Sequence, residues 1–290
     1  MQRPDIATAV RSATETAYAK INLALHVRGR RADGYHALES LFAFAEDGDL
    51  LRAEVNDSGV IDLTIDGPFA DGLSVGADNL VMRAAEGLQA LTGGAAGAHI
   101  HLDKRLPVAS GIGGGSADAA AALRLLMRLW DVALSPEALH ELALSLGSDV
   151  PACVVSQTQF VGGRGEELSQ ADVERLDGAP LLLVNPRTPL ATGPVFAGWD
   201  QVDRGALVAN SVAGLARDGR NDLEAPAMKL VPQIAEILGA LQAQPGVLLS
   251  RMSGSGATCF ALFDSVAARD EAQRRMNPAW WTMASRIRAA

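Results

Sequence analysis

The sequence predicts an α+β protein built from two domains, with a ligand site in the cleft between them. Three observations support this prediction. A period-two apolar pattern runs through residues 16–27, a glycine-rich segment at 107–117 leads into a helix, and strand and helix patterns alternate after about residue 158. That last region follows the order strand, helix, strand, strand, helix, strand, which is typical of a ferredoxin-like fold. We therefore expect an N-terminal domain at 1–158 and a C-terminal domain at 159–290.

The first predicted strand spans residues 16–27 and follows a polar segment that we expect to be a loose tail. Successive side chains of a strand point to opposite sides, so apolar residues such as Ile21 and Leu23 share one face. Lys20 and Asn22 fall on the other face. Two polar side chains thus lie two positions apart on an otherwise apolar strand.

The rest of the N-terminal half reads as further strands and helices. The dipeptide Asp33–Gly34 signals a turn after the first strand. Periodicity then predicts strands at 38–44, 50–55, 60–65 and 98–102, and a helix at 78–91.

A second helix is marked by its ends. Ser135 and Pro136 suit the N-cap and the first helical position, and the helix stops near Gly147. Pro151 disfavours helical geometry at the residue before it. We therefore expect Asp149 to lie in a turn just past the end of this helix.

The most informative segment holds four glycines within five residues, at 111 and 113–115. Glycine adds nothing to packing and is costly to order, so these residues serve backbone torsions or close approach. The next residues have helical spacing, and we predict a helix with Ser116 as its N-cap. A loop ahead of a helix N-terminus presents unpaired N–H groups and the positive end of the helix dipole. We therefore predict a phosphate site, with Gly114 at positive φ beside the phosphate oxygens.

The second half supplies the elements of the ferredoxin-like domain. We predict strands at 181–184, 247–252, 258–263 and 280–283, and helices at 226–243 and 265–276.

Composition excludes several classes of protein. A net charge of -9 argues against a nucleic-acid partner. No apolar run approaches the length of a membrane span, and the first residues lack a signal peptide's apolar core, so we expect a cytoplasmic protein. The two cysteines form no disulfide or metal pattern, and His99 and His101 lack a third ligand nearby. We expect no protein-bound metal site and no obligate protein partner.

Six segments together resemble the GHMP kinases, which phosphorylate small-molecule alcohols. Segments 19–23, 107–120 and 253–258 resemble the superfamily as a whole. Segments 31–36, 147–151 and 221–224 resemble the branch whose acceptor alcohol carries a cytidine group. The resemblance covers residues from about 16 to about 263, and the order and spacing of the segments make it specific. It implies the two-domain GHMP kinase fold, with ATP and Mg²⁺ used to phosphorylate a small cytidyl substrate.

The resemblance also implies roles for individual residues. Lys20 is expected at the γ-phosphate and the acceptor hydroxyl, Asp149 is expected to accept or orient the hydroxyl proton, and Asn22 is expected to support the substrate. The ATP loop is expected to comprise Pro107, Val108, Ala109, Ser110, Gly111, Ile112, Gly113, Gly114, Gly115, Ser116 and Ala117.

The base of the acceptor has its own expected contacts. By resemblance, the Tyr35 ring stacks on cytosine and His36 hydrogen-bonds the polar edge of the base. Thr192 and Phe196 resemble a segment of the second domain that closes over the cytidine end.

Two alternatives stay open from the sequence. One is a GHMP kinase with another acceptor, such as homoserine, mevalonate or a sugar, although the Tyr35–His36 pair would then have no purpose. The other is a non-catalytic nucleotide sensor on the same scaffold. Retention of both Lys20 and Asp149 argues against the sensor.

Overall fold

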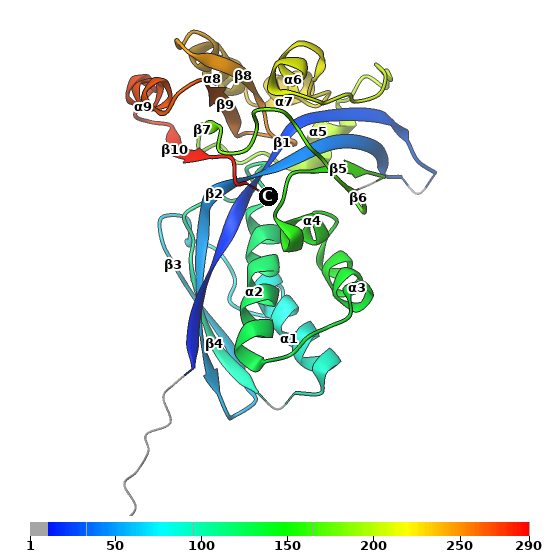
Figure 1. Ribbon diagram of the computed structural model, residues 1–290, viewed down its shortest axis with the longest axis vertical. Coiled ribbons are helices and arrows are strands. Elements are labelled where there is room, and N and C mark those ends of the chain that lie inside the picture. The colour runs from blue at the N-terminus through cyan, green and yellow to red at the C-terminus, as the bar shows by residue number, and fades with distance from the viewer. Residues whose placement is uncertain (1–10, 33, 95, 164, 290) are drawn as a thin grey trace, which may run out of the picture.

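The computed structural model describes residues 11–32, 34–94, 96–163 and 165–289. Two long antiparallel strands, β1 (Ser12–Arg30) and β2 (His36–Asn56), run through most of the molecule. In Figure 1 they rise beside the lower helices and curve beneath the upper half of the molecule. Their register shifts at three places along β1, and such bulges bend and twist a strand pair. The pair therefore belongs to both halves.

The first sheet has six strands within the described residues. Its order is β3-β4-β2-β5-β6, with β1 paired to β2. Three helices lie together on one side of this sheet (Figure 1), and the short α4 follows them in the chain. The elements are β3 (Ile61–Asp66), β4 (Gly97–Asp103), β5 (Gln159–Gly162), β6 (Glu167–Gln170), α1 (Leu80–Thr92), α2 (Gly114–Trp130), α3 (Pro136–Leu146) and α4 (Val150–Val155).

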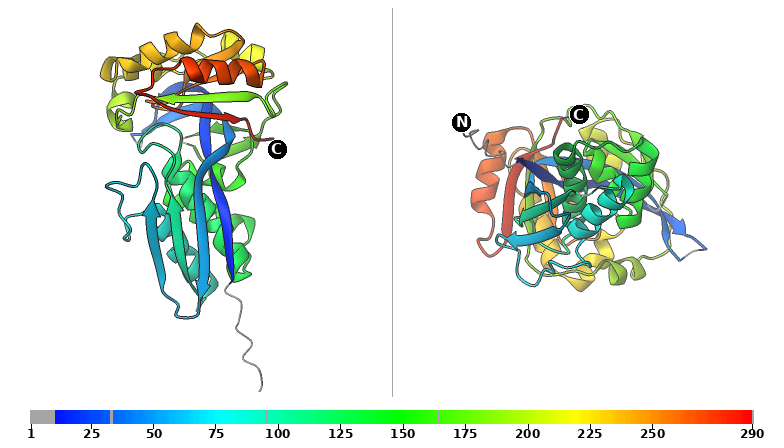
Figure 2. Two further views of the ribbon diagram at one scale, coloured as in Figure 1. Left: turned by 90° about the vertical axis from the view of Figure 1, so that its left-hand side faces the viewer. Right: turned by 90° about the horizontal axis from the view of Figure 1, so that it is seen from below.

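The second sheet has four strands within the described residues, in the order β10-β7-β9-β8. This order and the helices between the strands are those of a ferredoxin-like fold, as the sequence predicts. Figure 2 shows helices on the outer side of this sheet, away from the first half. The elements are β7 (Pro180–Asn185), β8 (Val247–Met252), β9 (Cys259–Phe263), β10 (Trp281–Arg286), α5 (Thr192–Ala197), α6 (Val212–Asp218), α7 (Glu224–Leu230), α8 (Gln233–Gln242) and α9 (Val266–Arg275).

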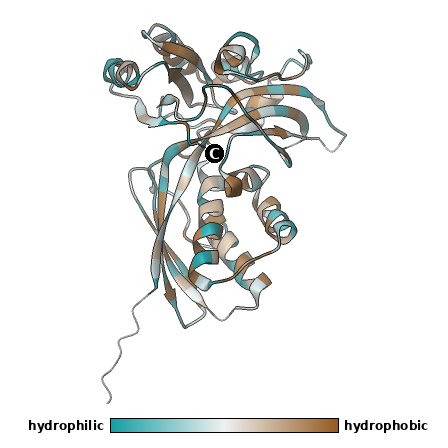
Figure 3. Ribbon diagram, in the orientation of Figure 1, coloured by the Kyte–Doolittle hydropathy of each residue, from teal (hydrophilic) through white to brown (hydrophobic). Residues whose placement is uncertain are grey.

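Apolar contacts hold the two halves together. One core lies between the first sheet and helices α1 and α2, which are largely apolar in Figure 3. Another joins the middle of β1 to the second sheet, where Ile21 and Leu23 pack in one cluster with Phe260 and Leu262. The middle of β1 is thus buried from both sides. Any polar side chain on this part of β1 is held in a fixed place inside the protein.

Some predicted elements differ from the structure. Residues 12–15, predicted as tail, form the start of β1, where Glu15 pairs with Arg124 and Arg128 of α2. The two strands predicted at 38–44 and 50–55 are one strand. Gly48 lies within it because a Cβ there would be 1.8 Å from the Ala17 carbonyl oxygen, so this glycine serves close approach of β1 and not a turn.

The helix predicted at 226–243 is two helices, α7 and α8, separated at Pro232. Proline cannot donate the helical hydrogen bond and its ring clashes with the preceding turn. Residues 159–170, just after the predicted domain boundary, pair as β5 and β6 with the first sheet, and the division at residue 158 stays a prediction. Asp33 of the predicted turn, and residues 1–10 of the predicted tail, lie outside the described residues.

Candidate active site

A cavity of about 940 Å³ lies between the two halves of the molecule. Its wall is formed by β1, β2, the glycine-rich loop, the segment after α3, and α5. Its size is that of a small-molecule site. The predicted site residues that line it are Lys20, Asn22, Tyr35, His36, Ala109, Ser110, Gly111, Gly113, Gly114, Gly115, Ser116, Asp149, Thr192 and Phe196.

The glycine-rich loop is held against a second glycine turn, at residues 253–258. The Thr258 N–H donates to the Ser110 carbonyl at 3.0 Å, and the Ser253 hydroxyl donates to the Gly111 carbonyl at 2.9 Å. Gly111 has a φ of 79°, and a Cβ there would be 2.4 Å from the Ser253 carbonyl oxygen. Glycine is required at this position by both torsion and space. The two turns thus form one rigid cradle.

The cap of α2 differs from the prediction. Gly113, with a φ of 64°, is the N-cap, and Ser116 is the third residue of the helix. The positive φ predicted for Gly114 is also wrong, because Gly114 is the first residue of the helix. A Cβ there would be 3.0 Å from Lys104 Nζ, while Gly114 also lines the cavity, and its contact with phosphate stays a prediction. At Gly115 the nearest atom to a Cβ is Leu80 Cδ1, at 3.5 Å, so the first turn of α2 is open toward the cavity.

A buried ionic cluster lies beneath this loop. The Lys104 ammonium donates to Asp49 at 2.5 Å and to Asp118 at 2.6 Å. The other oxygen of Asp49 accepts from the backbone N–H groups of Arg105 and Leu106. Lys104 therefore ties the chain just before the loop to α2 just after it.

This cluster holds two carboxylates and one ammonium away from water. Burial raises the pKa of Asp118 to about 8, because the gain from Lys104 does not offset the loss of hydration. Asp118 Oδ1 has no hydrogen-bond partner, whereas both oxygens of Asp49 accept hydrogen bonds. Asp118 is therefore the carboxyl that takes up a proton.

The predicted catalytic pair is brought together on the wall of the cavity. Lys20 Nζ lies 2.9 Å from the Asp149 carboxylate and donates to Asn22 Oδ1 at 2.8 Å. The ammonium also lies over the Phe42 ring, 4.3 Å from its centroid. Lys20 is 4% exposed, so its charge acts in a site that is mostly shielded from water.

Asn22 joins the Lys20–Asp149 pair to β2 and to the glycine turn at residues 253–258. Its amide nitrogen donates to the Ser40 hydroxyl at 2.9 Å, and its backbone N–H donates to the Ser253 hydroxyl at 3.0 Å. The Lys20 backbone N–H donates to the carbonyl of Ile112 in the loop at 3.0 Å. Lys20 is therefore fixed at both its backbone and its ammonium.

Aromatic rings gather at the other end of the cavity. The His36 ring lies 5.0 Å from the Phe196 ring and meets Trp199 edge-on at 5.6 Å. Burial lowers the pKa of His36, and Arg30 lowers it further, so the imidazole is neutral at pH 7. Tyr35 is 57% exposed and lines the same region. A planar, apolar ligand with a polar edge fits this end.

Known proteins resemble the chain over nearly its whole length. The models for the N-terminal domain and the C-terminal domain of the GHMP kinases match residues 79–157 and 204–281. The 4-diphosphocytidyl-2-C-methyl-D-erythritol kinase of Rhizorhabdus wittichii is 59% identical, covering 95% of this chain and 94% of its own. The chain is a GHMP kinase of the 4-diphosphocytidyl-2-C-methyl-D-erythritol kinase branch.

Solved structures agree with this assignment. A crystal structure of 4-(cytidine 5'-diphospho)-2C-methyl-D-erythritol kinase has a TM-score of 0.80 and 32% identity, and the match covers 96% of this chain and 100% of the other. A homoserine kinase from Cytophaga hutchinsonii has a TM-score of 0.74 at 16% identity, covering 100% and 98% of the two chains, which shows the shared fold alone. The predicted two-domain GHMP kinase fold is thus confirmed.

Four residues of the predicted ATP loop do not line the cavity. Ile112 and Ala117 are buried in the core, the Pro107 carbonyl accepts a hydrogen bond from the Ser110 hydroxyl, and Val108 is exposed to solvent. Their direct contact with ATP stays a prediction.

The structure adds residues that the sequence did not indicate. Ser40, Phe42 and Trp199 all line the cavity. Phe42 lies opposite Asn22 and Ser40 lies opposite Leu25 in the β1–β2 pairing, so only the strand register reveals them. Trp199 follows α5 in a segment without secondary structure, which gives no periodic signal.

No cluster of metal-ligating side chains occurs within the described residues. His99 and His101 instead pair with Asp62 and Asp66 on the neighbouring strand. Across the same residues, no helix is long and apolar enough to cross a membrane.

Proposed function

We propose that this kinase transfers the γ-phosphate of ATP to the 2-hydroxyl of 4-diphosphocytidyl-2-C-methyl-D-erythritol, a step of the non-mevalonate route to isoprenoid precursors. The observation that carries the proposal is the Lys20–Asp149 ion pair in one cavity that the glycine cradle and the aromatic rings also line. High identity to kinases of this name over nearly the whole chain supports the choice of acceptor.

The cradle binds the triphosphate. Gly115 and Ser116, in the first turn of α2, line the cavity, and the unpaired N–H groups and dipole of a helix N-terminus favour negative charge there. Mg²⁺ enters with ATP, since this ion keeps most of its ligands as phosphate oxygens and water. Ser116 lines the cavity, and its hydroxyl is a candidate partner for the triphosphate or for Mg²⁺.

Lys20 and Asp149 act on the acceptor hydroxyl. Asp149 accepts or orients the hydroxyl proton, and the Lys20 ammonium stabilises charge on the transferred group. Phosphoryl transfer has a loose transition state in most analyses, so positioning and charge contribute more than full deprotonation. The contacts of Lys20 with Asn22 and Asp149 hold the ammonium in place before substrate arrives.

The aromatic end selects the cytidyl group. Tyr35 supplies a ring for stacking, and neutral His36 offers one donor and one acceptor to the edge of cytosine. Thr192 shares a hydrogen bond with Ser255 at 3.0 Å, which joins α5 to the cradle. Phe196, one turn further along α5, packs on His36.

Release of ADP with a panel of acceptor alcohols tests the proposal. The purified kinase should release ADP with the cytidyl substrate and not with homoserine, mevalonate or galactose. Turnover of one of these in place of the cytidyl substrate would assign another acceptor. Binding of ATP without turnover of any alcohol would favour a nucleotide sensor.

A further inference from the structure

Asn221 and Asp222, part of the segment singled out in the sequence, lie behind the cavity wall and not on it. Both are buried or nearly so, and each uses its side chain to hold a different stretch of backbone. Asn221 donates to the carbonyls of Met252 and Gly254, each at 2.8 Å. It therefore fixes the glycine turn that supports the ATP loop.

Asp222 joins β1 to the segment that follows α6. Its carboxylate accepts from the Val27 backbone N–H at 2.8 Å and from Arg220 Nε at 2.8 Å. Arg220 in turn donates from Nη2 to the Gly205 carbonyl at 2.7 Å. The side chain of Asp222 is 2% exposed, so this chain of charged hydrogen bonds is shielded from water.

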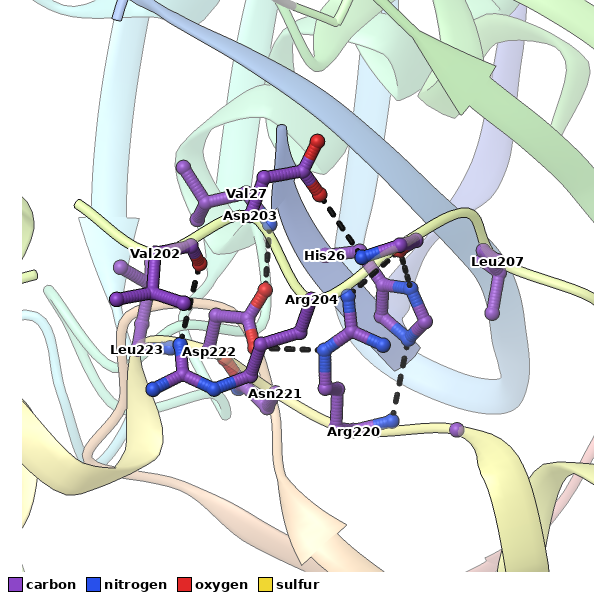
Figure 4. Close-up of polar contacts among 12 residues, drawn as sticks. His26, Val27, Val202, Asp203, Arg204, Leu207, Arg220, Asn221, Asp222 and Leu223 are labelled. Atoms are coloured by element: carbon purple, nitrogen blue, oxygen red, sulfur yellow. Dashed lines mark hydrogen bonds and ion pairs between the residues drawn. The ribbon is translucent and has the colours of Figure 1, made fainter. Parts of the chain in front are cut away.

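His26 closes the same network from β1. Figure 4 shows its imidazole between the backbone of Arg220 and the irregular segment that follows α5. Nε2 accepts from the Arg220 N–H at 3.3 Å, and Nδ1 lies 3.2 Å from the Gly205 carbonyl. One nitrogen must accept and the other must donate, which fits the neutral ring. Burial lowers the pKa of His26, and the nearby Arg220 charge lowers it further.

Gly205 belongs to residues 199–210, a segment without regular structure that we call the strap. The strap starts at Trp199, whose ring meets His36 edge-on, and Gln201 also lines the cavity. Beyond Gly205 it is held again by the Leu207 N–H, which donates to Glu39 at 2.7 Å. Short irregular segments with few backbone hydrogen bonds open easily unless side chains tie them down.

We propose that Asp222 and Arg220 are positioning residues that hold the strap so that Trp199 stays against His36, and that they thereby set the affinity for the base of the acceptor. The inference rests on the proposed function, since it assigns the aromatic end to the cytidyl group. Asn221, the neighbour of Asp222, holds the ATP end. Adjacent side chains therefore control opposite ends of one cavity.

Steady-state kinetics with Arg220→Met tests this division. The variant keeps an apolar stem but loses the hydrogen bond to the Gly205 carbonyl and the ion pair with Asp222. KM for the cytidyl substrate should rise about tenfold, the change expected for one hydrogen bond to a charged group. KM for ATP should change less than about twofold, because the loop contacts are untouched. Arg217→Met is the matched control, since Arg217 lies exposed on α6 and pairs with exposed Asp218.

Asn221→Ala tests the ATP end of the cavity. This variant should raise KM for ATP and leave KM for the cytidyl substrate near its original value. Arg220→Lys covers the case in which Arg220→Met does not fold, because lysine keeps a charge beside Asp222 but cannot also bridge to Gly205 in the planar geometry of a guanidinium. Equal rises of both KM values in Arg220→Met or Arg220→Lys, or no rise in either, would overturn the proposal.

Hydrogen exchange separates this inference from the proposed function. Exchange of the amides in the strap should speed up in Arg220→Met and stay unchanged in Arg217→Met, whatever alcohol the enzyme phosphorylates. Absence of turnover with the cytidyl substrate in the unmodified enzyme would refute the function, while faster strap exchange would still support the anchoring. Unchanged strap exchange would refute the anchoring itself.

Discussion

Lys104→Met should destabilise the protein, because Lys104 is the cation of the buried cluster beneath the ATP loop. Methionine keeps the length of the stem but removes the charge that Asp49 and Asp118 share. Removing one partner of a buried ion pair costs about 3–5 kcal/mol. Asp49 keeps its two backbone donors, and Asp118, whose pKa is raised to about 8, holds a proton near pH 7 and leaves no second uncompensated charge. We therefore expect the lower end, about 3 kcal/mol near pH 7.

Hydrogen exchange at the α2 amides measures this loss, since it reports local opening without assuming that both halves unfold together. Lys229→Met, at an exposed lysine of α7, is the matched control. Asp118→Asn in the Lys104→Met background should change this loss little near pH 7, because the Asp118 carboxyl, with its pKa raised to about 8, already holds a proton there. A loss below about 1 kcal/mol in Lys104→Met would equal that of a surface pair and refute the argument.

The remaining predictions concern activity and pH. Asp149→Asn should lower kcat by about 10²–10⁴-fold, and Lys20→Met by about 10²–10³-fold, with unchanged circular dichroism; near-normal turnover would remove either residue from the mechanism. Tyr35→Ala should weaken binding of the cytidyl substrate by about 1–3 kcal/mol, whereas Tyr35→Phe should leave calorimetric affinity unchanged, and equal effects of the two would exclude stacking. The raised pKa of Asp118 means that the folded state keeps a proton which the unfolded chain releases near pH 3.8. The free energy of unfolding should therefore fall as pH rises toward about 8, and Asp118→Asn should flatten this slope in urea titrations.

The local sequence pattern is sufficient to predict a structural feature where a single physical rule determines that feature. Alternation along β1 predicted that Lys20 and Asn22 share a face, and the structure joins them by a hydrogen bond. The strand and helix order after residue 158 predicted the ferredoxin-like sheet. Asp149 was expected in a turn, and it is the residue before α4, within 2.9 Å of Lys20.

Other features depend on contacts between distant segments. Glu46, Asp47 and Gly48 form a turn-like sequence, yet β2 continues through them because β1 pairs alongside and requires a glycine. The cap of α2 could not be placed, since both Gly113 and Ser116 suit an N-cap and the close packing of Lys20 on Gly113 decides between them. The break between α7 and α8 has a local cause, because Pro232 cannot donate the helical hydrogen bond.

The identity of the product tests the central claim most directly. Phosphorus NMR of a reaction with ATP, Mg²⁺ and 4-diphosphocytidyl-2-C-methyl-D-erythritol should show one new phosphomonoester for each ADP, with the diphosphate of the substrate intact. Mass spectrometry should place the added phosphate on the erythritol part, at the 2-hydroxyl. Formation of ADP without this phosphomonoester, or a phosphate attached elsewhere on the substrate, would contradict the assignment of the Lys20–Asp149 pair to that hydroxyl.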